Sequence, residues 1–194
     1  MRTTLLQDNG RWTTPWAYAF IVPLVLLNQG LGMVKDALQW PVYLDTIGTL
    51  LAAAFGGLVP GLLVGLLSNG LYEVYENFPG FEWPFGLVNM TSALICWAMV
   101  RSGLLKSFTG YLWLLVALIL ANSLLGAFLA TVLFGGVIGG PTDVIVQSLR
   151  ITGESVPSAA FLGHLFLNLV DKGVAVIVLV ATMRLVAERV RKRA

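Results

Sequence analysis

The sequence predicts an all-α integral membrane protein, a bundle of six transmembrane helices that forms one membrane-embedded domain over residues 1–194. Two observations lead to this class. Hydrophobic residues make up 57% of the chain and charged residues only 11%, whereas a soluble domain carries about 25% charged residues. The apolar residues also fall in long runs separated by short polar or glycine-rich segments. A soluble core could not bury so much apolar surface, so lipid is expected to cover it.

The first predicted span covers about residues 16–34 and follows a polar segment that lacks the design of a signal peptide. Pro23 lies inside this span, and Asn28 and Gln29 fall near its far end. A connector over residues 35–43 then carries Trp40 and Tyr43 towards the second span.

The second and third spans are predicted to form a helical hairpin over residues 43–77, opened by Asp45. Small residues recur at every fourth position on both limbs, and a glycine pair marks the turn between them: Gly48, Ala52 and Gly56, then Gly57, Gly61 and Gly65. In lipid, this spacing removes side chains from one helix face and lets two backbones approach closely. The pattern therefore predicts a packing seam inside the bundle.

Three further spans follow the hairpin. The fourth covers about residues 85–100 and the fifth about residues 111–134. A glycine-broken segment then leads to the sixth span, which begins near residue 159 and continues into a basic tail. This tail is interpreted as a membrane-surface anchor, and no patch typical of nucleic-acid binding is present.

The charges predict the orientation. With six spans, the side that holds both termini collects most of the basic residues: Arg2, Arg11, Arg101, Lys106, Arg184, Arg189, Arg191, Lys192 and Arg193. The opposite side collects mainly acidic residues: Asp36, Asp45, Glu73, Glu76, Glu82, Asp143 and Glu154. By the positive-inside rule, both termini are expected in the cytoplasm of a multi-pass protein of the cell membrane.

The sixth span carries a polar stripe. His164, Asn168 and Asp171 are spaced by four and three residues and so share one helix face. Ionisable groups at such depth are costly unless paired, which makes the stripe a candidate functional site. Asp171 and Lys172 are neighbours whose side chains leave the helix about 100° apart, so each is expected to have a different partner. A structural role for this pair and a site role are both open.

Aromatic residues gather in the outer loops and predict a concave site for a flat organic molecule: Trp40, Tyr43, Tyr72, Tyr75, Phe81 and Trp83. No phosphate-binding glycine loop, metal-binding histidine pair or serine-nucleophile motif occurs. The sequence therefore predicts a binding protein rather than an enzyme, with no cofactor and no metal, that depends on an external energy source.

Two segments resemble a known family. The run LDTIGTLLAAAFGGLVPGLLVGLLSN and the later run LVDKGVAVIVLVA resemble the substrate-binding S components of energy-coupling factor (ECF) transporters. The resemblance implies six spans, cytoplasmic termini and uptake of a vitamin or similar micronutrient. It also implies partners, namely a transmembrane coupling protein and two cytoplasmic ATPases, with which the subunit topples in the bilayer to release its substrate.

The resemblance also implies where the substrate binds. In that family the site lies at the outer ends of spans four to six, beneath the loop that joins spans one and two. Carried over by position, the substrate-binding residues are Trp40, Tyr43, Asn89, His164, Asn168 and Asp171. Asp45 and Lys172 are interpreted separately as structural residues. The family's span-one docking motif, A-x-x-x-A, is absent, because Ala17 and Ala19 are only two positions apart.

Two alternatives to transport are open. The chain is also compatible with a membrane sensory or scaffold module, since similar hairpins suit receptor input domains. A sensory module would be expected to carry a cytoplasmic output domain, and the given sequence shows none up to Ala194, which favours transport. An intramembrane enzyme that uses Asp171 or His164 lacks a second catalytic group at suitable spacing.

Overall fold

The computed structural model describes residues 18–77, 80, 82–140 and 142–193, and these residues form helices with no strand among them. The prediction of an all-α protein is therefore confirmed. The longer helices are α2 (Ile21–Ala37), α4 (Leu58–Tyr75), α5 (Gly86–Arg101), α6 (Phe108–Phe134), α7 (Asp143–Ile151) and α8 (Val156–Arg193). The short ones are α3 (Ile47–Leu51), the π-helix η1 (Ala52–Gly56), and the 3₁₀ turns η2 (Trp83–Phe85) and η3 (Leu104–Lys106).

Four segments among the described residues are long and apolar enough to cross a membrane: Leu58–Tyr75, Trp83–Arg101, Phe108–Phe134 and Val156–Lys192. The chain thus has the character of a multi-pass membrane protein. The segments expected as the first and second spans are shorter than these four. The first corresponds to α2, which has 17 residues, and the second to the short apolar helix Ile47–Gly56. The first residues of the expected first span, 16–17, lie outside the described residues.

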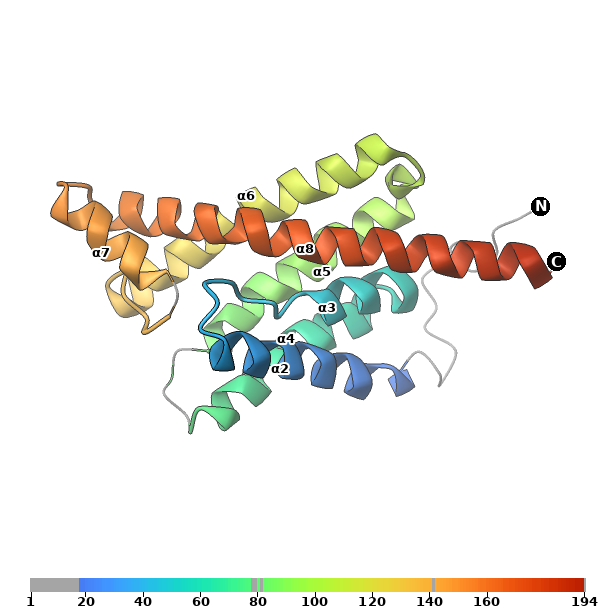
Figure 1. Cartoon of the computed structure of the whole chain (residues 1–194), viewed down its shortest axis with the longest axis horizontal. Helices are drawn as coiled ribbons and strands as arrows, with labels where there is room; N and C mark the ends of the chain where they lie inside the picture. Colours follow the sequence, from blue (N-terminus) through green and yellow to red (C-terminus); the bar gives the residue numbers. More distant parts are fainter. Residues whose placement is uncertain (1–17, 78–79, 81, 141, 194) are drawn as a thin grey trace.

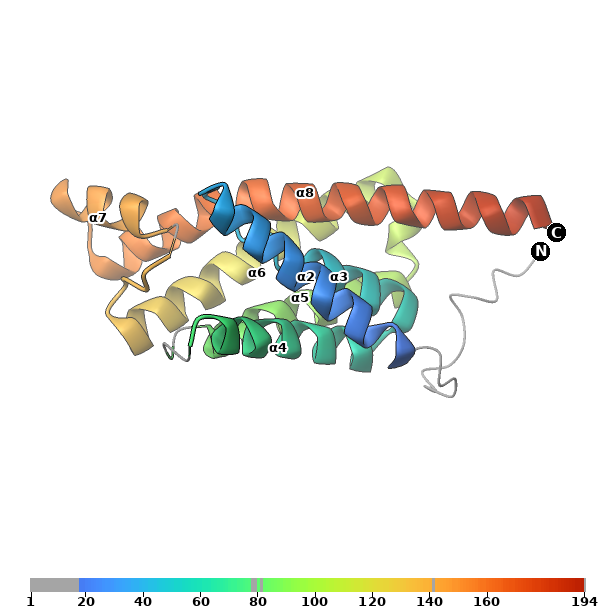
Figure 2. The ribbon, with the colours of Figure 1, turned by 60° about the horizontal axis from the view of Figure 1, so that its bottom comes forward.

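The helices lie lengthwise in one bundle, and α8 runs along its whole length (Figures 1 and 2). The short helix α7 marks one end of the bundle, and the C-terminal end of α8 projects from the other. The connector after α2, the loop between α4 and α5, and the loop between α6 and α7 all lie at the α7 end. Segments distant in sequence therefore meet at one end of the protein.

The outer surface of the bundle is apolar. Large hydrophobic side chains on α6 and α8 are more than half exposed: Leu124, Phe128, Val132, Phe166, Leu169 and Ile177. Inside the bundle, side chains of the same kind on the same two helices, Leu114, Leu118 and Leu179, are fully buried. Apolar residues on both faces of a helix are typical of membrane bundles, where lipid covers the outer face.

The predicted turn of the hairpin is present. The π-helix η1 ends at Gly57, whose φ of 92° is a left-handed value that a side chain would strain. The Gly57 N–H donates to the carbonyls of Ala52 and Ala53, which closes the first limb before α4 begins. The chain reverses because a glycine can adopt this conformation at low cost.

The predicted glycine seam is only partly right. A Cβ added at Gly61 would lie 2.8 Å from the Cβ of Ala53, so this glycine does join the two limbs. A Cβ at Gly65 would lie 2.9 Å from the backbone of Asn89 on α5, and one at Gly48 only 2.3 Å from the carbonyl oxygen of Leu24 on α2. The stripe therefore serves three helix contacts, because the hairpin is surrounded by neighbours on several sides.

Two glycines of α4 provide a matched test of this packing. We expect Gly65→Ala to destabilise the protein by about 1–3 kcal/mol, because the backbone of α5 must move away. Gly70→Ala has no atom within 4 Å of the added Cβ and is expected to be neutral or stabilising by up to about 1 kcal/mol. Thermal unfolding in detergent compares them, and equal melting temperatures would show that α4 and α5 are not in close backbone contact.

Candidate functional site

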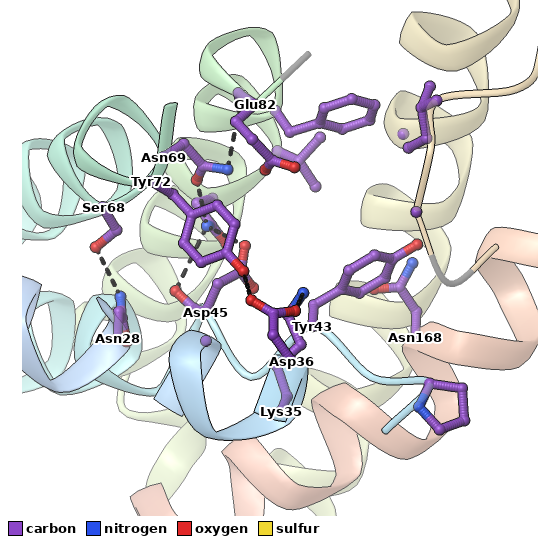
Figure 3. Close-up of a pocket in the computed structure, with 18 of the residues that line it drawn as sticks. Asn28, Lys35, Asp36, Tyr43, Asp45, Ser68, Asn69, Tyr72, Glu82 and Asn168 are labelled. Atoms are coloured by element: carbon purple, nitrogen blue, oxygen red, sulfur yellow. Dashed lines mark hydrogen bonds and ion pairs between the residues drawn. The ribbon is translucent and has the colours of Figure 1, made fainter. Parts of the chain in front are cut away.

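A cavity of about 460 Å³ lies in the bundle towards the α7 end. Its walls come from α2, α4, α5, α6 and α8, with further residues from α7, η2, the loop between α4 and α5, and the loop over residues 138–140. The connector, which covers residues 38–46 in the structure, completes the lining. Figure 3 shows Asn69 and Tyr72 on the α4 side, facing Tyr43 and Asn168 on the α8 side. The volume is within the range of small-molecule sites, about 300–1,000 Å³.

Asn89 on α5 is the centre of one polar network in the cavity. Its Nδ2 donates to Asp45 Oδ2 at 2.8 Å and to Asn69 Oδ1 at 2.7 Å. Its Oδ1 accepts from Thr46 Oγ1 at 2.9 Å. Asn89 is 1% exposed and lines the cavity. This single side chain therefore ties α4 and α5 to the start of the hairpin.

The polar stripe on α8 reaches the cavity through two of its three members. His164 Nδ1 shares a hydrogen bond of 3.0 Å with the hydroxyl of Tyr43, and the His164 ring also stacks near Phe85. Asn168 Nδ2 donates to Ser123 Oγ on α6 at 3.2 Å. His164, Asn168 and Tyr43 all line the cavity.

The third member, Asp171, has a different position from the predicted one. It does not line the cavity, whereas Lys172 and Asp45, predicted as structural residues, do line it. Asp171 Oδ1 accepts from the backbone N–H of Leu44 at 2.6 Å, and its Oδ2 pairs with Lys172 Nζ at 2.6 Å. Both carboxylate oxygens are therefore occupied within the protein.

The expectation of separate partners for Asp171 and Lys172 is only partly right. Each has a partner of its own, the Leu44 N–H for Asp171 and the Thr46 hydroxyl for Lys172, but the two also form an ion pair with each other. The lysine has a long flexible stem that can bend back towards its neighbour even though the two side chains leave the helix in different directions. Lys172 Nζ also donates to Thr46 Oγ1 at 2.6 Å, and both charged side chains are at most 2% exposed. The pair thus fastens α8 to the connector.

The connector is held in a conformation that the sequence does not favour. Leu44 has a φ of 55° and Gln39 a φ of 52°, left-handed values that cost a non-glycine residue roughly 1–3 kcal/mol. Such a conformation persists only when its surroundings fix it, and the hydrogen bond from Leu44 to Asp171 does so. It places Trp40, Tyr43 and Asp45 around the cavity.

The predicted aromatic set is partly present. Trp40, Tyr43 and Tyr72 line the cavity, whereas Tyr75 and Trp83 do not. Phe81 lies outside the described residues. Phe85 lines the cavity without having been predicted, because η2 turns it inward after the loop. Three of the six aromatic residues predicted for the site therefore line the cavity.

Acidic residues lie near the cavity, where some hold the surrounding loops in place and others line the cavity wall. Glu73 is structural, since its carboxylate accepts from the backbone N–H groups of Gly80, Glu82 and Trp83. Asp36 pairs with Lys35 at 2.7 Å and accepts from the hydroxyl of Tyr72. Asp45, Glu76 and Glu82 line the cavity, so the site presents several carboxylates to a bound molecule.

Two groups that line the cavity have altered acidity. Burial, followed by the nearby charges of Glu76 and Asp45, raises the pKa of Glu82 to about 7. Because the folded protein favours the protonated form of Glu82, this side chain becomes charged only near neutral pH. A cation or an N–H donor bound beside it would favour the charged form. Burial and the charge of Asp171 raise the pKa of Tyr43 well above its usual range, so its phenol stays protonated.

Several lining residues were not predicted as site residues: Gln29, Gly32, Ser68, Val88, Gly126 and the loop 138–140. The sequence contains a signal for one of them, because Gln29 is a second amide directly after Asn28 in an apolar span. The others are small or apolar and become site residues only through tertiary packing.

No group of three or more His, Cys, Asp or Glu side chains among the described residues is arranged to hold a metal ion. Cys96 is fully buried and its thiol contacts the carbonyl of Leu50.

Comparisons of the chain with family models, with curated proteins and with solved structures found no match.

Proposed function

We propose that the chain is the substrate-capture subunit of an ATP-driven importer of the ECF type, which binds a vitamin or a related small ring compound. The observation that carries this proposal is the cavity itself. It lies among the helices of the bundle and is lined in part by a connector that the Leu44–Asp171 hydrogen bond holds in place, and its walls carry amides, carboxylates and aromatic rings. Concave sites with a few convergent polar groups and apolar walls are typical of small-molecule binding.

The proposed orientation places this cavity on the outside of the cell membrane. The C-terminal part of α8 carries basic residues at the end opposite α7: Arg184, Arg189, Arg191 and Lys192. The cavity end carries most of the acidic residues, including Asp36, Glu76 and Glu82. The positive-inside rule then supports a cytoplasmic C-terminus, with α2 and the Ile47–Gly56 helix completing a bundle of six membrane segments.

The proposed cycle assigns a separate task to each part of the site. The cavity holds the substrate, while the connector covers it and is fastened to α8 through Asp171 and Lys172. Release requires energy, which a transmembrane coupling protein and two cytoplasmic ATPases would supply by making the subunit topple in the bilayer. The resemblance in the hairpin and in the DK pair of α8 supports this assignment of partners.

The test is to identify the proteins that assemble with the chain. We expect a C-terminally tagged chain, solubilised from its native membrane in mild detergent, to copurify with one polytopic coupling protein and two ATPase subunits. The complex should hydrolyse ATP, and inactivating the ATPases should abolish uptake. Copurification with a histidine kinase or another output protein, without ATPases, would contradict the proposal and favour the sensory alternative.

A further inference from the structure

Gln29 on α2 is an exception among the buried polar groups of the cavity. It lines the cavity and is 8% exposed, yet neither its Nε2 nor its Oε1 has a hydrogen-bond partner within the described residues. Its neighbour Asn28 is fully engaged, because Oδ1 accepts from the Gly48 N–H and Nδ2 donates to Thr49 and Ser68. A buried amide without partners in a cavity wall calls for a partner that the described residues do not supply.

The chemistry of an amide defines that partner. A glutamine side chain presents one acceptor and one donor side by side, and it pairs best with a planar group that offers a donor next to an acceptor. This is how glutamine reads the amino group and the adjacent ring nitrogen of adenine. The complementary edge is therefore an amino group beside a ring nitrogen.

The other walls of the cavity favour the same kind of molecule. Asp45 and Glu82 supply acceptor oxygens, while the charge of Lys172 is already balanced by Asp171. An anionic ligand would lie beside these carboxylates at a cost, whereas N–H donors would be stabilised. Tyr43, Phe85 and His164 supply flat ring surfaces.

We propose that the cavity binds a neutral or cationic nitrogen heterocycle with an amino group beside a ring nitrogen, and that the Gln29 amide pairs with this edge. The inference rests on the proposed capture function and adds the class of substrate. A bidentate pair of this kind discriminates against a ring without the amino group by about five- to a hundredfold in affinity.

Matched probes test the inference on the full chain in lipid nanodiscs. Isothermal titration compares adenine with purine and aminopyrazine with pyrazine, and nicotinate serves as an anionic ring. We expect the amino member of at least one pair to bind about five- to a hundredfold more tightly than its partner, and nicotinate to bind most weakly. Gln29→Leu should abolish this preference, while Gln147→Leu, a change at an exposed glutamine of α7, should retain it.

A second measurement separates binding from folding. Since Gln29 has no partner among the residues that the structure describes, Gln29→Leu should melt at the same temperature as the parent or higher when no probe is present. The inference is overturned if no amino probe is preferred, if nicotinate binds most tightly, or if the preference survives in Gln29→Leu. If the purified chain still carries another compound in its cavity, only the substrate class is wrong, whereas an empty cavity contradicts the capture function itself.

Discussion

Lys172→Met is expected to destabilise the protein by about 3–5 kcal/mol, the range measured when one partner of a buried ion pair is removed. The substitution leaves the carboxylate of Asp171, 1% exposed, without its counter-charge. It also removes the donor to Thr46 at the start of the hairpin. Thermal or denaturant unfolding in detergent measures the loss, and the same preparation shows whether the connector has become accessible to protease.

Two controls define the cause of this loss. Lys35→Met breaks the partly exposed pair with Asp36 and should cost about 0–1 kcal/mol. The double variant Asp171→Asn with Lys172→Met removes both charges and keeps an acceptor for the Leu44 N–H, so it should recover most of the stability. If Lys172→Met and Lys35→Met have the same melting temperature, the buried ion pair does not hold α8 to the connector.

The class of fold follows from the sequence because lipid imposes simple rules on it. Long apolar runs and few charges predict helices with apolar outer faces, and the structure has them on α6 and α8. The break at Gly57 was predictable because only glycine adopts its φ easily. The short length of the Ile47–Gly56 helix was also predictable, because the glycine pair at 56–57 ends it. The end of α2 at Ala37 was not, since hydropathy alone does not mark it.

The site was predictable where residue type and helix periodicity act together. Spacing placed His164 and Asn168 on one face of α8, and both line the cavity. The sequence does not reveal that the connector offers the Leu44 N–H to Asp171, so the position of this residue outside the cavity lining was not predictable. Gln29 and Phe85 become site residues through the positions of α2 and η2.

The amount of compound bound in the cavity is expected to fall strongly in two variants, one that removes a polar group and one that adds a larger side chain. Asn168→Ala removes a polar group from the cavity wall, and losing such a hydrogen bond weakens binding roughly five- to a hundredfold. Gly126→Val adds bulk to the wall, where even a Cβ would lie 3.0 Å from His164 Nδ1. Asn77→Gly is the control, since Asn77 is exposed, does not line the cavity and has a φ of 63° that glycine accepts.

The measurement is mass spectrometry of the small molecules released from the purified protein, quantified per mole of folded chain. A capture protein predicts one defined ring compound on the parent and on Asn77→Gly, and at least about fivefold less on Asn168→Ala and Gly126→Val. A parent protein that carries no more than an unrelated membrane protein from the same cells, or equal amounts on all four chains, would contradict a substrate-binding cavity at this place.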